Sequence, residues 1–390
     1  MLTHKAHIGA ALAALSISTL AVTVSAAAPG VAQTPPVGQA SPVAVITGAE
    51  SINATMARYQ VKGTDLGIMW TDDKGQILAA FGDTFGSGWA GVKSGFATPN
   101  KIDWRSNTLA ISRDRNPADG MSFNNFVTDR PGHAKELLPS LKKDGVEMTQ
   151  IPTGGINIDG RDYLAYMSIR SFTQPGHWIT NYGAIAYSDD GGKTWKEVSS
   201  TRRENTKALD DTFQMIAFAQ RDGYVYSYGT PNGRFGNAHV ARVPQRQLLD
   251  KSAYEYWTGS GWQRGNSSIA SPIVKGPVGE LSVRYDKVLN SWEMMYLDES
   301  TKAIVVRLAP RPEGPWGTPM AVATASEYPN LYGGFLNPDS EGRDLYFTMT
   351  QYDRYNVSMM HARLPASVEP KAQPDRGPSP GKNSGSGGGA

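Results

Sequence analysis

The feature that most constrains the fold of this 390-residue chain is a pair of short strands that recurs five times. Each copy has an apolar strand, a polar turn containing Asp, Asn or Gly, and a second strand in which large apolar residues alternate with others. Turns of this chemistry favour β-hairpins. The expected hairpins cover residues 66–81, 155–167, 213–228, 280–297 and 333–349.

Five hairpins with almost no helical periodicity between them predict a radially repeated sheet protein. We therefore expect an all-β fold, a five-bladed β-propeller in a single domain. At about 65 residues per blade, the repeats exceed the roughly 40 to 50 that are usual. The surplus predicts long loops that shape a pocket.

The segment Ser188-Asp189-Asp190-Gly191-Gly192-Lys193-Thr194-Trp195 fits the S-x-D-x-G-x-T-W pattern called an Asp-box. The Asp and the hydroxyl side chains satisfy turn amides, Gly takes a positive φ, and Trp packs beneath the turn. The motif is common in propellers of sugar-processing enzymes. We expect Asp190 to cap a hairpin rather than to take part in catalysis.

Three acidic residues lie at strand ends that a propeller brings together. Asp65 opens the first inner strand, Asp83 follows the apolar run 77–81 between glycines, and Glu280 opens the inner strand of the fourth blade. A carboxylate near a strand end must be hydrated or paired. The alternatives are a strand-start cap for Asp65, a hairpin turn for Asp83, and an ion pair with Arg284 for Glu280.

Sugar pockets need flat apolar surfaces for ring C–H groups and planar donors for hydroxyl pairs. Clusters of aromatic, amide and arginine side chains recur near the predicted strand ends. The residues that we predict to bind substrate, besides Glu280, are Trp104, Arg105, Asn107, Gln214, Asn232, Arg234 and Tyr332.

Other chemistries lack their signatures. The chain has no cysteine, and its four histidines beyond residue 26 do not have the close spacing of a metal site. Serine-hydrolase, Walker and dinucleotide-binding motifs do not occur. The net charge of +2 gives no electrostatic case for nucleic acid. We expect neither a cofactor nor a resident metal.

The N-terminal region combines Lys5 with a short apolar stretch that ends in small residues, as in a secretory signal peptide. A retained anchor is the alternative reading. We expect a signal peptide over residues 1–26, a disordered Ala/Pro-rich leader over 27–45, the propeller over 46–366 and a disordered Pro/Gly/Ser tail over 367–390. The protein is then secreted or held in the cell envelope, with no membrane span after cleavage.

The segments 64–67 (TDLG), 81–86 (FGDTFG), 104–107 (WRSN), 231–234 (PNGR) and 279–284 (GELSVR) together resemble the actinobacterial endo-D-arabinanase glycoside hydrolases, long catalogued as a domain of unknown function. The similarity extends from about residue 64 to residue 364. It implies a five-bladed propeller that cuts internal α-D-arabinofuranosyl linkages in the D-arabinan of mycobacterial arabinogalactan and lipoarabinomannan. Asp65 and Asp83 match the two essential carboxylates of that family.

The leading hypothesis is therefore an exported endo-acting glycosidase in which one of Asp65 and Asp83 is the general acid and the other the base or nucleophile. Either assignment fits the sequence, and analogy with other five-bladed arabinan-cleaving propellers favours inversion. The alternatives are a non-catalytic cell-wall-binding propeller that holds arabinan and an exo-acting glycosidase of the same fold.

Overall fold

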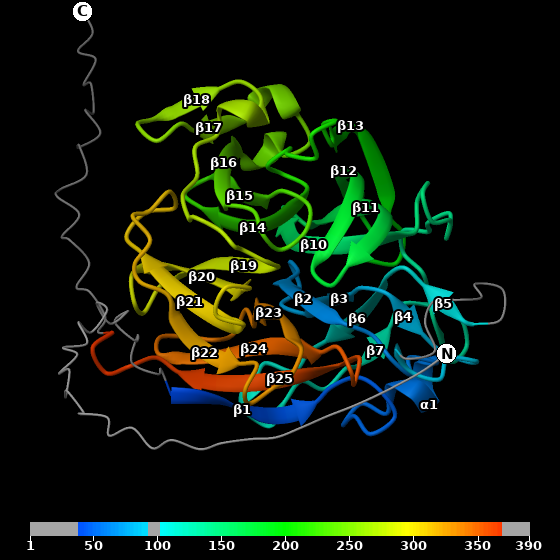
Figure 1. Ribbon diagram of the computed structural model, residues 1–390. Helices are drawn as coiled ribbons and strands as arrows, with labels where there is room; N and C mark the ends of the chain where they lie inside the picture. The colour runs from blue at the N-terminus through cyan, green and yellow to red at the C-terminus, as the bar shows by residue number, and fades with distance from the viewer. Residues whose placement is uncertain (1–37, 93–101, 369–390) are drawn as a thin grey trace, which may run out of the picture. The chain divides into compact units, whose positions relative to one another are not determined.

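The computed structural model describes residues 38–92 and 102–368 (Figure 1). Five antiparallel sheets of four or five strands make up most of this part of the chain. In pairing order they are β2 (Leu66–Thr71), β3 (Ile77–Phe81), β6 (Thr108–Ser112) and β7 (Asn125–Phe126); β10 (Thr149–Ile158), β11 (Arg161–Gln174), β12 (His177–Ser188) and β13 (Lys196–Glu204); β14 (Met215–Arg221), β15 (Tyr224–Thr230), β16 (His239–Pro244), β17 (Glu255–Trp257) and β18 (Trp262–Arg264); β19 (Leu281–Asp286), β20 (Ser291–Asp298), β21 (Ala303–Ala309) and β22 (Met320–Thr324); and β23 (Leu331–Leu336), β24 (Asp344–Gln351), β25 (Asn356–Arg363) and β1 (Gly38–Val45).

Short elements fill the connections between these sheets. They are α1 (Thr55–Tyr59), the strand pairs β4 (Thr84–Phe85) with β5 (Trp104–Arg105) and β8 (Thr128–Arg130) with β9 (His133–Ala134), and the 3-10 turns Pro117–Asp119, Gln245–Gln247, Lys251–Ala253 and Ser267–Ile269. No helix among the described residues is both long enough and apolar enough to cross a membrane.

The first strands of the five sheets form a ring. β2 contacts β10, β10 contacts β14, β14 contacts β19, β19 contacts β23, and β23 contacts β2 again. Each predicted hairpin is the first strand pair of a different sheet, with its two strands antiparallel. This arrangement, visible in Figure 1, confirms the predicted all-β propeller.

Close approach at the centre of the ring depends on two adjacent glycines of β10. A Cβ atom on Gly154 would lie 2.5 Å from the carbonyl oxygen of Ile216 in β14, and one on Gly155 would lie 2.0 Å from the Trp70 ring in β2. These positions have no room for a side chain, because the neighbouring strands occupy that space. The glycines thereby let three first strands meet at the axis.

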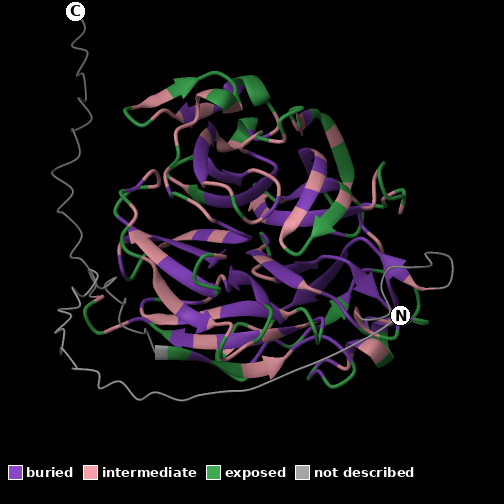
Figure 2. Cartoon of the chain, viewed as in Figure 1, coloured by how far each residue is buried: buried purple, intermediate pink, exposed green. Residues whose placement is uncertain are grey.

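The hydrophobic core has layers between neighbouring sheets and one larger cluster that takes residues from all five sheets, among them Leu66, Ile151, Met215, Met295 and Leu331. One layer packs Leu78 and Leu109 of one sheet against Leu164 of the next. Another packs Tyr226 and Val240 against Val283, Met294 and other residues of the following sheet. Figure 2 shows that buried residues lie mostly on the inner strands, whereas exposed residues lie on the outer strands and connections. Every sheet is therefore stabilised by both neighbours.

The expected leader boundary at residue 45 is wrong, because residues 38–45 form β1. This strand pairs antiparallel with β25, with irregularities between Gly38 and Ser41 and between Pro42 and Ala44. The composition of this segment is typical of a linker. A strand at the edge of a sheet nevertheless tolerates proline, because the backbone N–H groups on its outer side do not have to pair with another strand. The predicted signal peptide, the rest of the predicted leader and the predicted tail beyond residue 368 lie outside the described residues.

The Asp-box forms the predicted turn between β12 and β13. Asp190 Oδ1 accepts hydrogen bonds from the backbone N–H groups of Lys193 (3.0 Å) and Thr194 (2.9 Å), and the Thr194 hydroxyl donates to Asp190 Oδ2 at 2.6 Å. Trp195 donates to the Gly192 carbonyl and meets Trp70 edge-on. Asp190 thus caps a turn, as the motif predicts.

Candidate active site

A cavity of about 570 Å³ opens at the ends where the first strands begin. One residue from the start of each first strand borders it: Leu66, Ile151, Met215, Leu281 and Leu331. The polar lining includes Asp65, Asp83, Glu280, Arg234, Tyr332 and Tyr355, contributed by connections and strands far apart in sequence. The ring therefore brings the three predicted acids to one cavity.

Asp65 is positioned by an irregular start to β2. Leu66 has a φ of 70° and Gly67 a φ of 87°, and the pairing with β3 shifts between Leu66 and Ile68. The Tyr332 hydroxyl donates to Asp65 Oδ2 at 2.9 Å. On the other side, a Cβ atom on Gly82 would lie 2.3 Å from Asp65 Oδ1. The Asp65 carboxyl group thus packs directly against the backbone of Gly82, and this contact helps to hold the carboxyl group in place.

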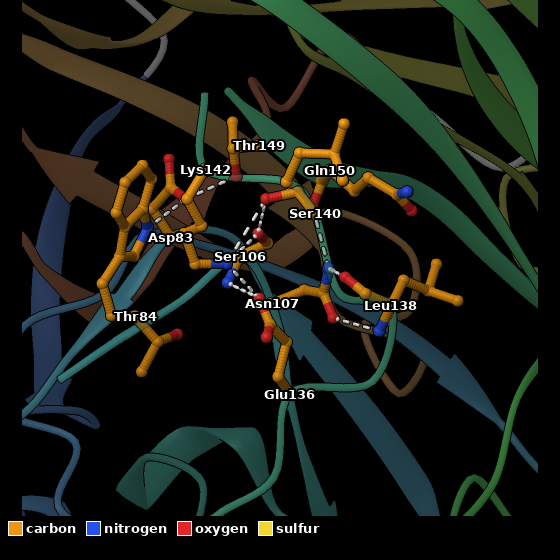
Figure 3. A network of polar contacts seen from close by, with 12 residues as sticks. Asp83, Thr84, Ser106, Asn107, Glu136, Leu138, Ser140, Lys142, Thr149 and Gln150 are labelled. Atoms are coloured by element: carbon orange, nitrogen blue, oxygen red, sulfur yellow. Dashed lines mark hydrogen bonds and ion pairs between the residues drawn. The ribbon is translucent and has the colours of Figure 1, made fainter. Parts of the chain in front are cut away.

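Asp83 lies just after β3 and is only 3% exposed. The Trp104 indole N–H donates to Asp83 Oδ1 at 2.7 Å, and the Thr149 hydroxyl donates to the same oxygen at 2.6 Å. Figure 3 shows Asp83 beside Thr149. Two donors to one carboxylate oxygen favour the ionised form of Asp83.

The two environments give the carboxyl groups different proton affinities. Burial, followed by the charge of Asp83, raises the pKa of Asp65 to about 8. Burial raises the pKa of Asp83 to about 6, and the donors Thr149 and Trp104 and the charge of Lys142 oppose that rise. At neutral pH Asp65 therefore carries a proton and Asp83 does not. A pair of carboxyl groups with separated pKa values can act as acid and base.

Glu280 forms an ion pair with Arg234. The Nε and Nη2 atoms of Arg234 donate to Glu280 Oε1 at 2.9 and 2.8 Å, and the guanidinium lies 4.8 Å from the centre of the Tyr332 ring. The alternative partner, Arg284, instead pairs with Glu293 and with Asp286. Arg234 thus connects Glu280 to the tyrosine that donates to Asp65.

Several residues predicted to contact substrate hold loops instead. Arg105 donates to the backbone carbonyls of Gln60 and Ala134 and forms an ion pair with Asp103. Asn107 accepts from the N–H groups of residues 137 and 138 and donates to the carbonyls of residues 138 and 150. Neither side chain borders the cavity. The prediction for these two residues was wrong because polar side chains at strand ends also satisfy the backbone groups of irregular loops.

Gln214 and Asn232, also predicted to contact substrate, do not border the cavity either. Gln214 accepts from the Thr180 hydroxyl and donates to the Arg203 carbonyl, while Asn232 accepts from Asn205 and donates to the Trp178 carbonyl. Trp104 lies behind Asp83 as its hydrogen-bond donor and does not border the cavity. Of the predicted contacts, Glu280, Arg234 and Tyr332 border it.

Other residues of the site carry no signal in the sequence. Thr149 and Lys142 act on Asp83, and Tyr355 lies at the cavity beside Asp65. None belongs to a recognisable local motif, since each reaches the site from another segment of the ring. Across residues 38–92 and 102–368, no group of three or more His, Cys, Asp or Glu side chains is arranged to hold a metal ion.

Burial of the acid pair predicts a pH-dependent cost in stability. The folded-state pKa values, about 8 and about 6, lie above the unfolded value of 3.8. Between about pH 4 and pH 8 the two carboxyl groups bind more protons in the folded state than in the unfolded state. The stability that these groups contribute is therefore present below about pH 4 and is lost as the pH rises to about 8. We expect the double variant Asp65→Asn/Asp83→Asn to gain melting temperature over the wild type as pH rises.

Thermal unfolding followed by circular dichroism between pH 4 and pH 9 measures this difference. The two melting curves should nearly coincide at pH 4 and separate toward pH 8. A constant offset at every pH would show that the two carboxyl groups do not titrate differently in the folded and unfolded states.

The fold and the site place this chain among β-propeller proteins with an acidic central cavity. Residues 50–361 match the model of a family described as "Domain of unknown function (DUF4185)", and the chain belongs to this family. The Notoamide biosynthesis cluster protein J' of Aspergillus versicolor is 33% identical to it over 313 residues, which cover 76% of this chain and 82% of the relative.

Solved structures resemble the chain in fold. A provisionally assigned hydrolase from Bacteroides ovatus has a TM-score of 0.53 at 14% sequence identity, and the alignment covers 80% of this chain and 88% of that one. The family 117 glycoside hydrolase Zg3597 of Zobellia galactanivorans has a TM-score of 0.48 at 10% identity, with 85% and 92% covered.

Proposed function

We propose that this protein is a glycoside hydrolase whose acid–base pair is Asp65 and Asp83. The observation that carries the proposal is that both carboxyl groups border one cavity in unlike environments. Asp83 receives two short hydrogen bonds on one oxygen, whereas Asp65 is buried beside that negative charge and receives one from Tyr332. Glycoside hydrolysis requires one protonated and one ionised carboxyl group on the two sides of the scissile bond.

The unlike environments support one assignment of the roles within this proposal. Asp65 donates its proton to the leaving oxygen as the bond between that oxygen and the anomeric carbon breaks. Asp83 takes a proton from the water that attacks the anomeric carbon, which gives inversion, or attacks that carbon itself, which gives retention. Proton NMR of the first product formed distinguishes the two routes by its anomeric signal.

The substrate that we propose is D-arabinan, cut at internal α-D-arabinofuranosyl linkages as in mycobacterial arabinogalactan and lipoarabinomannan. The motifs around residues 64–67, 81–86 and 279–284 support this choice, since they resemble those of endo-D-arabinanases. The cavity is compatible with a sugar, because Trp178 and Tyr332 provide apolar ring surfaces and Glu280 and Arg234 provide polar contacts. Export by the N-terminal segment, which would bring the enzyme to a cell wall, is part of the same proposal.

Digestion of purified mycobacterial arabinogalactan tests the proposal. We expect a ladder of arabinan oligosaccharides with the wild-type protein and none with the Asp65→Asn/Asp83→Asn double variant. Release of only mono- or disaccharides would replace the endo-acting assignment by an exo-acting one. Binding to arabinogalactan without release of any saccharide would refute catalysis and leave a carbohydrate-binding propeller.

A further inference from the structure

A polar cluster whose residues do not border the cavity lies close to Asp83 (Figure 3). We call it the lysine cluster, and it consists of Lys142, Glu136, Ser106 and Ser140. The Lys142 ammonium donates to the Ser106 hydroxyl at 2.9 Å, to the Ser140 hydroxyl at 3.3 Å and to the Glu136 carboxylate. An ammonium has three donors, and here all three are engaged. The cation is therefore fixed at one point.

The lysine cluster is connected to the reacting carboxylate through one indole ring. The Lys142 nitrogen lies 5.1 Å from the centre of the Trp104 ring, and the N–H of that ring donates to Asp83 Oδ1 at 2.7 Å. A cation over an aromatic face is attracted to it and draws electron density from the ring. The indole N–H thereby becomes a stronger hydrogen-bond donor, and a stronger donor stabilises the ionised form of Asp83.

The loop between β9 and β10, which carries Lys142, is also anchored by a residue outside the lysine cluster. Asn107 already fixes the same loop by four hydrogen bonds, to the backbone at Leu137, Leu138 and Gln150. Lys142 also has a φ of 54°, a left-handed conformation that a glycine or asparagine adopts at lower cost. The loop therefore does not depend on the Lys142–Glu136 ion pair alone, and the same ammonium also lies over the Trp104 ring.

We propose that Lys142 is a positioning residue that fixes the Trp104 indole against Asp83 and supplies the positive charge that keeps this carboxylate ionised. The inference rests on the proposed function. The other titratable groups around Asp83 are Asp65 and Tyr355, which border the cavity, and Glu136, which does not. Among the described residues, the positive charge of Lys142 counteracts the negative charges of Asp65 and Glu136 near Asp83. It lowers the pKa of Asp83, whereas burial raises that pKa.

An NMR titration tests this role without any substrate. Selective 15N labelling of the nine tryptophans gives one indole N–H signal for each of them. The signal that disappears in the Trp104→Phe variant belongs to Trp104. The Trp104 N–H signal should follow the titration of Asp83, with a midpoint that rises by about 0.5 to 1 pH unit in Lys142→Met. Lys142→Arg, which keeps the charge, should restore the wild-type midpoint, and Lys143→Met is the matched control at the exposed neighbour.

Enzyme kinetics provide the second readout. The acidic limb of the kcat/KM profile on arabinan should move up in Lys142→Met by the same amount as the NMR midpoint, while the alkaline limb stays in place. Glu136→Gln removes a negative charge and should lower the midpoint of the Asp83 titration. This variant still tests the proposal if Lys142→Met does not fold. Equal midpoints in the wild type and in the charge-altering variants would overturn the role of Lys142. Absence of saccharide release by the wild type would instead refute the proposed function, and the NMR comparison would still decide the role of the lysine.

Discussion

Replacement of Asp83 by asparagine is expected to lower kcat/KM on D-arabinan by about 10⁴-fold. The amide oxygen of asparagine can still accept from Trp104 and Thr149, whose hydrogen bonds both end on one oxygen of the native carboxylate. What the variant loses is the negative charge that activates water or attacks the sugar. Release of reducing ends from arabinogalactan measures the effect.

A correctly folded protein is the necessary control for Asp83→Asn. The variant should bind arabinan oligosaccharides as the wild type does, because the walls of the cavity are unchanged. An Asp83→Asn protein with more than about a tenth of wild-type turnover would assign the base to another residue. Sodium azide that restores activity and yields a glycosyl azide of inverted configuration would show that Asp83 acts on the face of the sugar opposite the leaving group.

Replacement of Asp65 by asparagine is expected to cost about 10³-fold on arabinan but far less on an activated aryl α-D-arabinofuranoside. The difference arises because a sugar leaving group needs a proton, whereas a nitrophenolate leaves without one. In the wild type, activity should fall below about pH 6 as Asp83 gains a proton and above about pH 8 as Asp65 loses one. The variant should lose the alkaline limb and keep the acidic one.

Initial rates on both substrates from pH 4 to pH 10 test this assignment. An Asp65→Asn variant that is equally impaired on arabinan and on the aryl glycoside would show that Asp65 is not the general acid. Tyr332→Phe is a useful companion, since it removes the hydrogen bond that Asp65 Oδ2 receives and leaves the carboxyl group in place. It should raise the alkaline limit, because that bond lowers the pKa of Asp65.

The sequence was informative where the signals are local. Turn chemistry and alternation are properties of a few consecutive residues, so the hairpins that begin the five sheets could be predicted. The meeting of Asp65, Asp83 and Glu280 followed from their places at strand ends, because a propeller brings those ends together. β1 was missed because its pairing with β25 is a long-range property that composition does not reveal.

Substrate contacts were predicted less well for a physical reason. An amide or arginine beside an aromatic residue at a strand end can face a cavity or bind loop backbone, and both uses leave the same local pattern. Arg234 faces the cavity, whereas Asn107 and Gln214 bind loops. Thr149 and Lys142 could not be recognised in advance, since their importance comes from Asp83, which lies in another segment.

The pairing of β1 with β25 has a consequence for how the protein is made. The most N-terminal described strand has its only strand partner in the last strand of the ring, so it must wait, unpaired, while the intervening 300 or so residues are synthesised. Ring closure is then a late event that joins the two ends in a single seam. Nascent fragments that stop short of residue 356 lack that seam, and the cavity walls supplied by the last sheet become fixed only when the whole chain is present.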